Sequence, residues 1–302
     1  MAWNAQAADL WFAHWAPGRG EKGAKMIWGR LVRNVFPQLG KRPIADIPAS
    51  AFRDVAKSVE GRAPTVARQM LQYCSQIMRH AVAHDLAERN PVADLQAGDV
   101  LRVHKTRNHA RVDAKDLPAL LHALDHYGGD ESTRLAFRLL SLTFVRTGEL
   151  VEATWQEFDL DNARWDIPVA RMKMDTPHVV PLSRQSIEAL KRLKLLSYGG
   201  DFVFPGRGSH KRSMSRATML VALRSMGYGG RMTGHGFRGV ASTILHEQAY
   251  PHDQIELQLA HQSRGKVSAA YNHALYLKPR AKMMQEWADF IDKERSSYKP
   301  PL

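Results

Sequence analysis

The sequence predicts a mainly helical protein of the α+β class, with a helical first domain and a mostly helical second domain that contains a small antiparallel three-stranded sheet. Three observations lead to this fold class. Apolar residues recur at helical spacing through most of the 302 residues. This spacing lapses between residues 98 and 111, and near residue 160 an alternation of apolar and polar residues replaces it. We therefore expect a helical domain over 1–98, a basic linker over 99–112 and a second domain over 113–302.

The helices of the first domain are predicted from their apolar faces and from residues that begin or end helices. In the segment 20–36 the expected apolar face is Met26, Ile27, Leu31, Val32 and Val35. Pro37 is expected to end this helix. Ser50 is expected to cap the start of the next helix and Gly61 to cap its end. The longest helical pattern covers 63–86.

The second domain is expected to open with a helix capped by Asp113 and to change from helices to strands after residue 154. Three short strands are expected, at 158–160, 165–167 and 178–182. Asp161 and Asn162 form the turn between the first two strands. Helices resume at 183–197 and, after FVFPGRG, continue to near residue 292.

The chain carries a spread positive charge, which limits the kind of partner. Residues 1–110 contain 16 Lys and Arg against 9 Asp and Glu, and residues 111–302 contain 27 against 21, so both parts are basic. The net charge is +13. A basic surface attracts polyanions, of which nucleic acid is the commonest. A basic soluble protein without such a ligand is the alternative.

Cys74 is the only cysteine, which excludes an intramolecular disulfide and a thiolate metal cage. It lies within an apolar helical pattern, so we expect it to be buried. The sequence contains no apolar run long enough to span a bilayer, and its N-terminus lacks the form of a signal peptide. The expected location is the cytoplasm.

Five basic side chains are candidates for contacts with a nucleic acid. Arg62, Arg68 and Arg79 lie along the longest helical pattern, and Lys105 and Arg107 lie in the linker. A basic linker between two basic domains suits a protein that encircles a duplex. A solvated helix face and an ordinary solvated linker are the alternatives.

A cluster of acids near the hairpin raises the alternative of a metal-dependent nuclease. The four acids are Glu157, Asp159, Asp161 and Asp166. They fall on the polar face and the turn of the predicted hairpin, so we expect no metal site there. A zinc site is excluded by spacing, because Tyr250 stands where the motif that begins LHE needs a second histidine.

Three separate segments supply groups suited to a phosphate. His235 and Arg238 share a face at the start of a helix, where free N–H groups and the helix dipole also attract an anion. Arg146 follows a strongly apolar helix with Glu149 close behind, which is typical of a half-buried ion pair. Lys173 lies between the hairpin and its third strand, where it can extend into a groove as a proton donor. A capping or solvent-facing role is the alternative for each residue alone.

His261, in LAH, and Tyr271, ten residues later, complete an ordered set. The order RTGEL, K, HxxR, LAH and Y resembles that of the tyrosine recombinases, the phage integrase family. RMKMDTPHVVPLS, TGHGFRGVASTILHE and AAYNHALYL are similar to integrases of the satellite-prophage type. The resemblance covers nearly the whole chain, and it implies a core-type DNA-binding domain followed by a catalytic domain. Relatives of this type carry a further N-terminal domain that binds arm sites, which we expect this chain to lack.

The resemblance implies a covalent reaction at Tyr271. The phenol attacks the scissile phosphate and leaves a 3′-phosphotyrosyl enzyme and a free 5′-hydroxyl. Lys173 protonates the leaving 5′-oxygen, and His235 assists proton transfer at the tyrosine. Tyr276 is the rival nucleophile, but the spacing from LAH favours Tyr271.

The resemblance also implies the groups that bind the phosphate. Arg146 and Arg238 contact its non-bridging oxygens and stabilise the charge of the transition state. His261 donates a hydrogen bond to it, and Glu149 positions the region of Arg146.

The function implied is site-specific DNA recombination or integration without metal, ATP or any other cofactor. The expected partners are double-stranded DNA with an attachment core site, further copies of the chain in a homotetramer on DNA, and accessory DNA-bending proteins. The chain is expected to be a monomer without DNA. A type IB topoisomerase, which relaxes DNA as a monomer, and a catalytically silent DNA-binding prophage remnant are the alternatives.

Overall fold

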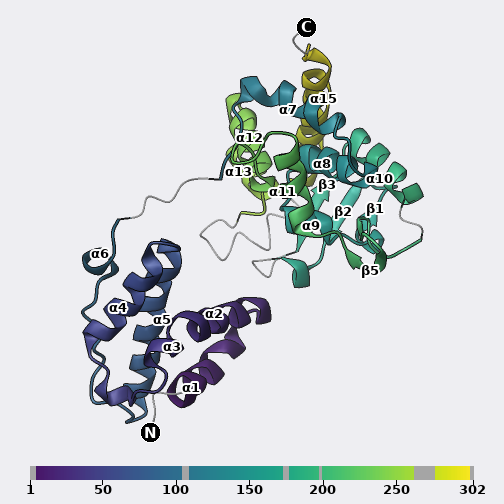
Figure 1. The fold of residues 1–302 in the computed structure, drawn as a ribbon. Coiled ribbons are helices and arrows are strands. Elements are labelled where there is room, and N and C mark those ends of the chain that lie inside the picture. Colours follow the sequence, from purple (N-terminus) through teal and green to yellow (C-terminus); the bar gives the residue numbers. More distant parts are fainter. Residues whose placement is uncertain (1–4, 104–108, 173–176, 197–198, 262–275, 300–302) are drawn as a thin grey trace. The chain divides into compact units, whose positions relative to one another are not determined.

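The computed structural model describes residues 5–103, 109–172, 177–196, 199–261 and 276–299 (Figure 1). Four residues singled out in the sequence lie outside the described residues: Lys105, Arg107, Lys173 and Tyr271. The chain divides into two compact units, Met1–Arg107 and Asn108–Leu302. Residues 109–112, at the end of the predicted linker, therefore fall within the second unit.

The first unit is helical and has one apolar core. Its described helices are α1 (Ala5–Trp15), α2 (Glu21–Asn34), α3 (Phe36–Leu39), α4 (Ala49–Glu60), α5 (Pro64–Ala83) and α6 (Ala97–Val100). α4 packs along α5, and α1 and α2 also contact α5. Each contributes apolar side chains such as Leu31, Phe52 and Met78 to the core. Cys74 is buried there, as predicted, and burial raises the pKa of its thiol to about 12.

The predicted apolar face of α2 is too wide. Met26 and Val32 are exposed, at 48% and 43%. Ile27, Leu31 and Val35 are buried, because only one narrow stripe of this helix faces the core. Sequence periodicity identified the helix but not the width of its contact.

Two predicted helix boundaries in the first unit are wrong. Ser50 does not cap α4, which begins one residue earlier, after Pro48, and has no side-chain cap. Pro37 does not end α2, because α2 already stops at Asn34. Pro37 lies in the first turn of α3, where a backbone N–H would have no partner within the helix, so proline is tolerated there. In the second unit, Asp113 precedes a short 3-10 turn and makes no capping hydrogen bond with its side chain.

The second unit is mostly helical and contains the predicted three-stranded antiparallel sheet, which confirms the fold class. Its described helices are α7 (Leu117–Asp125), α8 (Glu131–Thr143), α9 (Thr147–Val151), α10 (Arg184–Leu196), α11 (Arg216–Ser225), α12 (Gly234–Glu247), α13 (His252–Gln258) and α15 (Leu277–Ser297). The strands β1 (Phe158–Asp159), β2 (Arg164–Ile167) and β3 (His178–Pro181) lie in the order β1-β2-β3. Trp165 pairs with Phe158 on one side and with Val180 on the other. Trp165, Ile167 and Val180 are buried, which accounts for the alternation that predicted the sheet.

A second hairpin was not predicted. β4 (Pro205–Gly206) pairs with β5 (Ser209–Ser213) across a turn in which Gly208 has a φ of 74°. β5 reads SHKRS and none of its residues is buried, so the sequence shows no apolar alternation. The expected helix after FVFPGRG begins only at α11.

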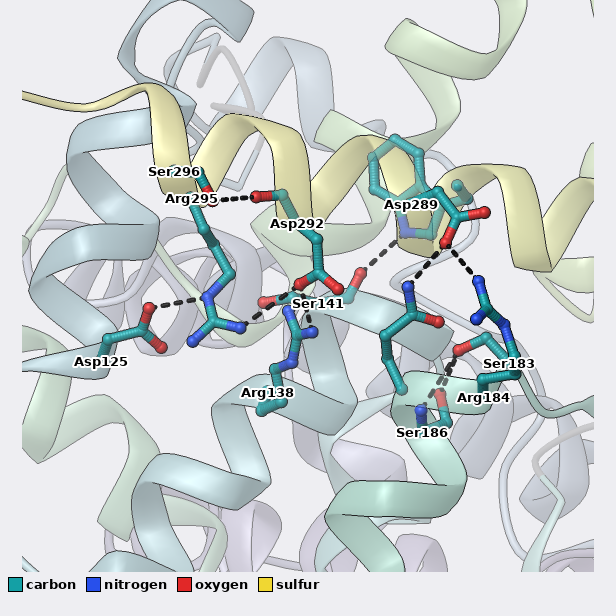
Figure 2. Close-up of polar contacts among 12 residues, drawn as sticks. Asp125, Arg138, Ser141, Ser183, Arg184, Ser186, Asp289, Asp292, Arg295 and Ser296 are labelled. Atoms are coloured by element: carbon teal, nitrogen blue, oxygen red, sulfur yellow. Dashed lines mark hydrogen bonds and ion pairs between the residues drawn. The ribbon is translucent and has the colours of Figure 1, made fainter.

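The C-terminal helix α15 is held against α7 and α8 by polar contacts as well as by its apolar face (Figure 2). Arg138 of α8 forms an ion pair with Asp292. Arg295 Nε lies 2.7 Å from Asp125 Oδ2 of α7. The indole N–H of Trp287 donates to a backbone carbonyl of α8 at 2.8 Å. These contacts fix α15, which follows the segment that contains the predicted nucleophile.

Candidate active site

Arg146 is held at the start of α9 by a buried carboxylate. α8 ends at Thr143, and the left-handed backbone of its C-cap Phe144 (φ 39°) turns the chain so that Arg146 becomes the N-cap of α9. Glu149 accepts hydrogen bonds from the Arg146 backbone N–H at 2.8 Å and from Arg146 Nη1 at 2.7 Å. Arg146 Nη2 donates to the Ala260 carbonyl at 3.2 Å. The Arg146 side chain is 25% exposed, so it keeps donors that an anion can reach.

Arg238, in α12, is almost fully buried and is held by backbone carbonyls. Its Nη1 donates to the Phe144 carbonyl at 2.9 Å and its Nη2 to the Leu259 carbonyl at 2.5 Å. These carbonyls lie at the C-terminal ends of α8 and α13, which carry partial negative charge. Burial, followed by the charge of Arg146, lowers the pKa of Arg238 to about 10, so it remains charged at neutral pH. Among the described residues its Nε has no hydrogen-bond partner.

His261 is presented by the turn that ends α13. The His261 backbone N–H donates to the Glu256 carbonyl at 2.9 Å, and Ala260, at φ 49°, makes the left-handed step of this Schellman motif. The His261 Nδ1 lies 2.9 Å from Glu256 Oε2. Because a carboxylate only accepts, Nδ1 carries a proton, which leaves Nε2 to accept from Arg238 Nη2 at 3.2 Å.

His235 lies in the first turn of α12 and is exposed. The Thr233 side chain caps this helix by accepting from a backbone N–H at 3.0 Å. Desolvation, and then the positive charge of Arg238 and of other basic neighbours, lowers the pKa of His235. The neutral imidazole that results is a proton acceptor.

Four of the six predicted catalytic residues thus come together around the turn 259–261: Arg146, His235, Arg238 and His261. The other two, Lys173 and Tyr271, lie outside the described residues. Tyr276 is described, and its backbone carbonyl accepts from an N–H in the first turn of α15. Two guanidinium groups and two imidazoles at one turn are chemically suited to bind an oxyanion.

A buried arginine that the sequence analysis missed ties this cluster together. Arg280 of α15 is fully buried, and its Nη2 donates to the Val179 carbonyl of β3 at 2.7 Å and to Gln258 Oε1 at 2.6 Å. Gln258 in turn donates to the Thr143 carbonyl at 3.2 Å. One side-chain pair therefore joins β3, α8, α13 and α15. The burial of Arg280 could have been predicted from its position seven residues before Trp287, which places it on the apolar face of α15.

The acid Glu157 has a different role from the one predicted. It is buried rather than on the polar face, because Arg171 forms an ion pair with it and the Trp165 indole donates to it at 2.9 Å. Arg171 also donates to the Glu149 carbonyl, which links the hairpin to α9. In the described part of the chain, no group of three or more His, Cys, Asp or Glu residues could hold a metal ion.

The described DNA-binding candidates are all exposed. Arg68 and Arg79 lie on α5. Arg62 lies between α4 and α5 and donates to Asn34 Oδ1 at 2.5 Å, so one of its donors is used within the unit. No helix in the described ranges is both long and apolar enough to cross a membrane.

Comparison with known proteins identifies the family of the chain. Residues 110–278 match the phage integrase family and residues 5–98 match the phage integrase central domain. Prophage integrase IntZ of Escherichia coli (strain K12) is 40% identical over 288 residues, which are 95% of this chain and 70% of that protein.

Two solved structures share the fold. A lambda integrase dimer bound to a COC′ core site aligns with a TM-score of 0.68 and 16% identity, over 98% of this chain and 79% of that one. A lambda integrase tetramer bound to a Holliday junction aligns with a TM-score of 0.69 and 16% identity, over 86% and 77%. The chain belongs to the phage integrase family and is a tyrosine recombinase.

Proposed function

We propose that this site-specific recombinase cleaves and rejoins double-stranded DNA through a 3′-phosphotyrosyl intermediate on Tyr271, without metal or ATP. The observation that carries the proposal is the convergence of Arg146 and Arg238 on the turn 259–261. That turn lies ten residues before Tyr271 in the sequence.

The two arginines bind the non-bridging oxygens of the scissile phosphate. Attack adds negative charge to these oxygens, so fixed donors stabilise the transition state more than the ground state. Arg238 supplies a buried charge, and Arg146 a partly exposed one that DNA can reach. His261, with its Nδ1 held by Glu256, directs Nε2 toward the same place and donates to the phosphate when protonated.

Proton transfer accompanies each bond change. A phenol has an ordinary pKa of about 10, so it needs a base near neutral pH. Neutral His235 accepts this proton as the Tyr271 oxygen bonds to phosphorus and the bond from phosphorus to the 5′-oxygen breaks. Lys173 gives a proton to that 5′-oxygen. The phosphotyrosyl bond keeps the energy of the phosphodiester, so a 5′-hydroxyl from another strand reseals it by the reverse steps.

A nicked suicide duplex that carries the attachment core site tests the nucleophile. The wild-type protein and the Tyr276→Phe control are expected to form a covalent adduct in the presence of a chelator, and Tyr271→Phe is expected to form none. A persistent adduct with Tyr271→Phe would contradict the assignment.

We further infer that residues 1–98 bind the core site, that 99–112 link the two domains, and that four copies assemble on two duplexes. The solved lambda integrase tetramer on a Holliday junction supports this assembly. Arg68, Arg79, Lys105 and Arg107 would contact phosphates, and Arg62 would use its remaining donors. Strand exchange between two labelled duplexes tests the assembly. Relaxation of supercoiled DNA by a monomer, without exchange, would favour a topoisomerase.

A further inference from the structure

A short segment before α7, His109–Arg111, lies against the catalytic helix α12. Arg111 Nη1 donates to the Gly239 carbonyl at 2.8 Å and to Thr243 Oγ1 at 3.0 Å. The Thr233 hydroxyl, at the other end of this contact, donates to the Ala110 carbonyl at 3.3 Å. Three hydrogen bonds therefore fix the path of this segment along the first three turns of the helix.

Two glycines of α12 make the contact possible. A Cβ atom at Gly236 would lie 2.6 Å from the Ala110 carbonyl oxygen, which is closer than real Cβ contacts come. A Cβ atom at Gly239 would lie 3.0 Å from side-chain atoms of Arg111. In HGFRG, Gly236 therefore leaves room for the backbone of Ala110, and Gly239 leaves room for the side chain of Arg111.

The segment brings a second histidine to the one assigned as base. The rings of His109 and His235 have centroids 4.5 Å apart and are inclined by 51°. Apart from this contact, the charged and titratable groups that act on His235 are Arg238 on its own helix, Arg146 at α9 and His261 after α13. His109 belongs to the 109–111 segment. Of the elements that bring these groups to His235, this segment alone carries no residue of the predicted catalytic set.

We propose that His109 is a positioning residue for His235 in DNA cleavage. Its ring packs against the His235 ring and restricts its rotation, and its positive charge, when present, opposes protonation of His235. Both effects keep His235 oriented as a neutral proton acceptor. The proposal rests on the function proposed for His235, but its test has a readout that does not depend on cleavage.

The experiment compares His109→Ala with His109→Phe in the full chain. His126→Ala is the matched control, because His126 makes a similar ring contact with His122, at 4.0 Å, within α7 and its end. For each variant the cleavage rate on the suicide duplex is measured against pH. The titration of the His235 ring is followed separately by NMR of the free protein.

We expect His109→Ala to lower the cleavage rate roughly tenfold, through loss of orientation. His109→Ala should also raise the pKa of His235, because one positively charged neighbour is removed. The acidic limb of the plot of cleavage rate against pH and the NMR titration of His235 should therefore both move to higher pH. His109→Phe keeps the ring contact but not the charge, so it should recover the rate above the limb while the limb stays shifted. The control should match the wild type.

The results separate three cases. An unchanged rate and titration in His109→Ala would overturn the proposal. A lower rate with an unchanged titration and pH profile would also overturn it, since that result indicates a structural role. If the wild-type protein forms no adduct, the proposed function fails, and the NMR titration alone still decides whether His109 acts on His235.

Discussion

Glu149→Gln tests whether a buried carboxylate holds Arg146 in place. The Glu149 and Arg146 side chains are 4% and 25% exposed, so solvent screens their interaction little. Glutamine keeps one acceptor oxygen but replaces the other by an amide donor, which faces a donor of Arg146. The change removes one charge-assisted hydrogen bond and leaves the guanidinium without its counter-charge near Arg238.

A hydrogen bond to a charged group contributes about 1.5–3 kcal/mol. With the uncompensated charge added, we expect the free energy of unfolding of the second unit to fall by about 2–4 kcal/mol. Glu152→Gln is the control, because Glu152 pairs with Arg216 at 2.8 Å while their side chains are 33% and 62% exposed. Its expected cost is below about 1 kcal/mol.

Hydrogen exchange in peptides that cover 139–153, measured over a urea series, reports the opening free energy of this region apart from the first unit. Cleavage of the suicide duplex is measured in parallel and should fall only for Glu149→Gln. Equal losses of stability in the two variants would refute the reasoning, because burial would then not decide the strength of the pair.

Four further outcomes are expected. Gly234→Ala places a Cβ atom 2.1 Å from Thr147 Oγ1, so it should separate α12 from α9 and lower the cleavage rate about tenfold. Gly128→Ala is the control, because a Cβ atom there meets nothing within 4 Å, and its cleavage rate should equal that of the wild type. Ala260→Gly should raise the unfolding free energy by about 0.5–1 kcal/mol, because Ala260 has a φ of 49°; a thermal melt checks this. Folding lowers the pKa of His235 from 6.5, so the unfolded chain binds the His235 proton more tightly than the folded chain does. The free energy of unfolding should therefore fall as the pH drops through 6.5, and it should fall less in His235→Gln. The urea midpoint measured against pH checks this. DNA affinity should decrease steeply with salt, since phosphate contacts release counterions, and a flat response in a titration would count against binding by a basic surface.

The sheet was predictable where its residues face both core and solvent. Trp165 and Ile167 alternate with polar neighbours because one face of β2 is buried. β5 lacks this constraint, so no pattern marked it in the sequence. The apolar spacing of α2 was visible as well, but how much of that face is covered depends on how its neighbours pack.

The polar site was predictable as an ordered set of residue types and not as a geometry. Arg146 and Arg238 were identified from their motifs, but their carbonyl partners were not, because Phe144 and Ala260 adopt left-handed conformations that these residue types rarely take. Arg280 and His109 were missed for a related reason. Each contacts residues far away in the sequence, and residue spacing does not encode such contacts.

The carbonyl partners of Arg238 have a consequence for the approach of DNA. An arginine paired with a carboxylate must exchange one anion for another when a phosphate arrives, and the displaced carboxylate must then be resolvated. Arg238 is held by the neutral Phe144 and Leu259 carbonyls instead, so its orientation is fixed without a competing anion. The free-energy cost of orienting Arg238 is therefore incurred when the chain folds, before it binds DNA.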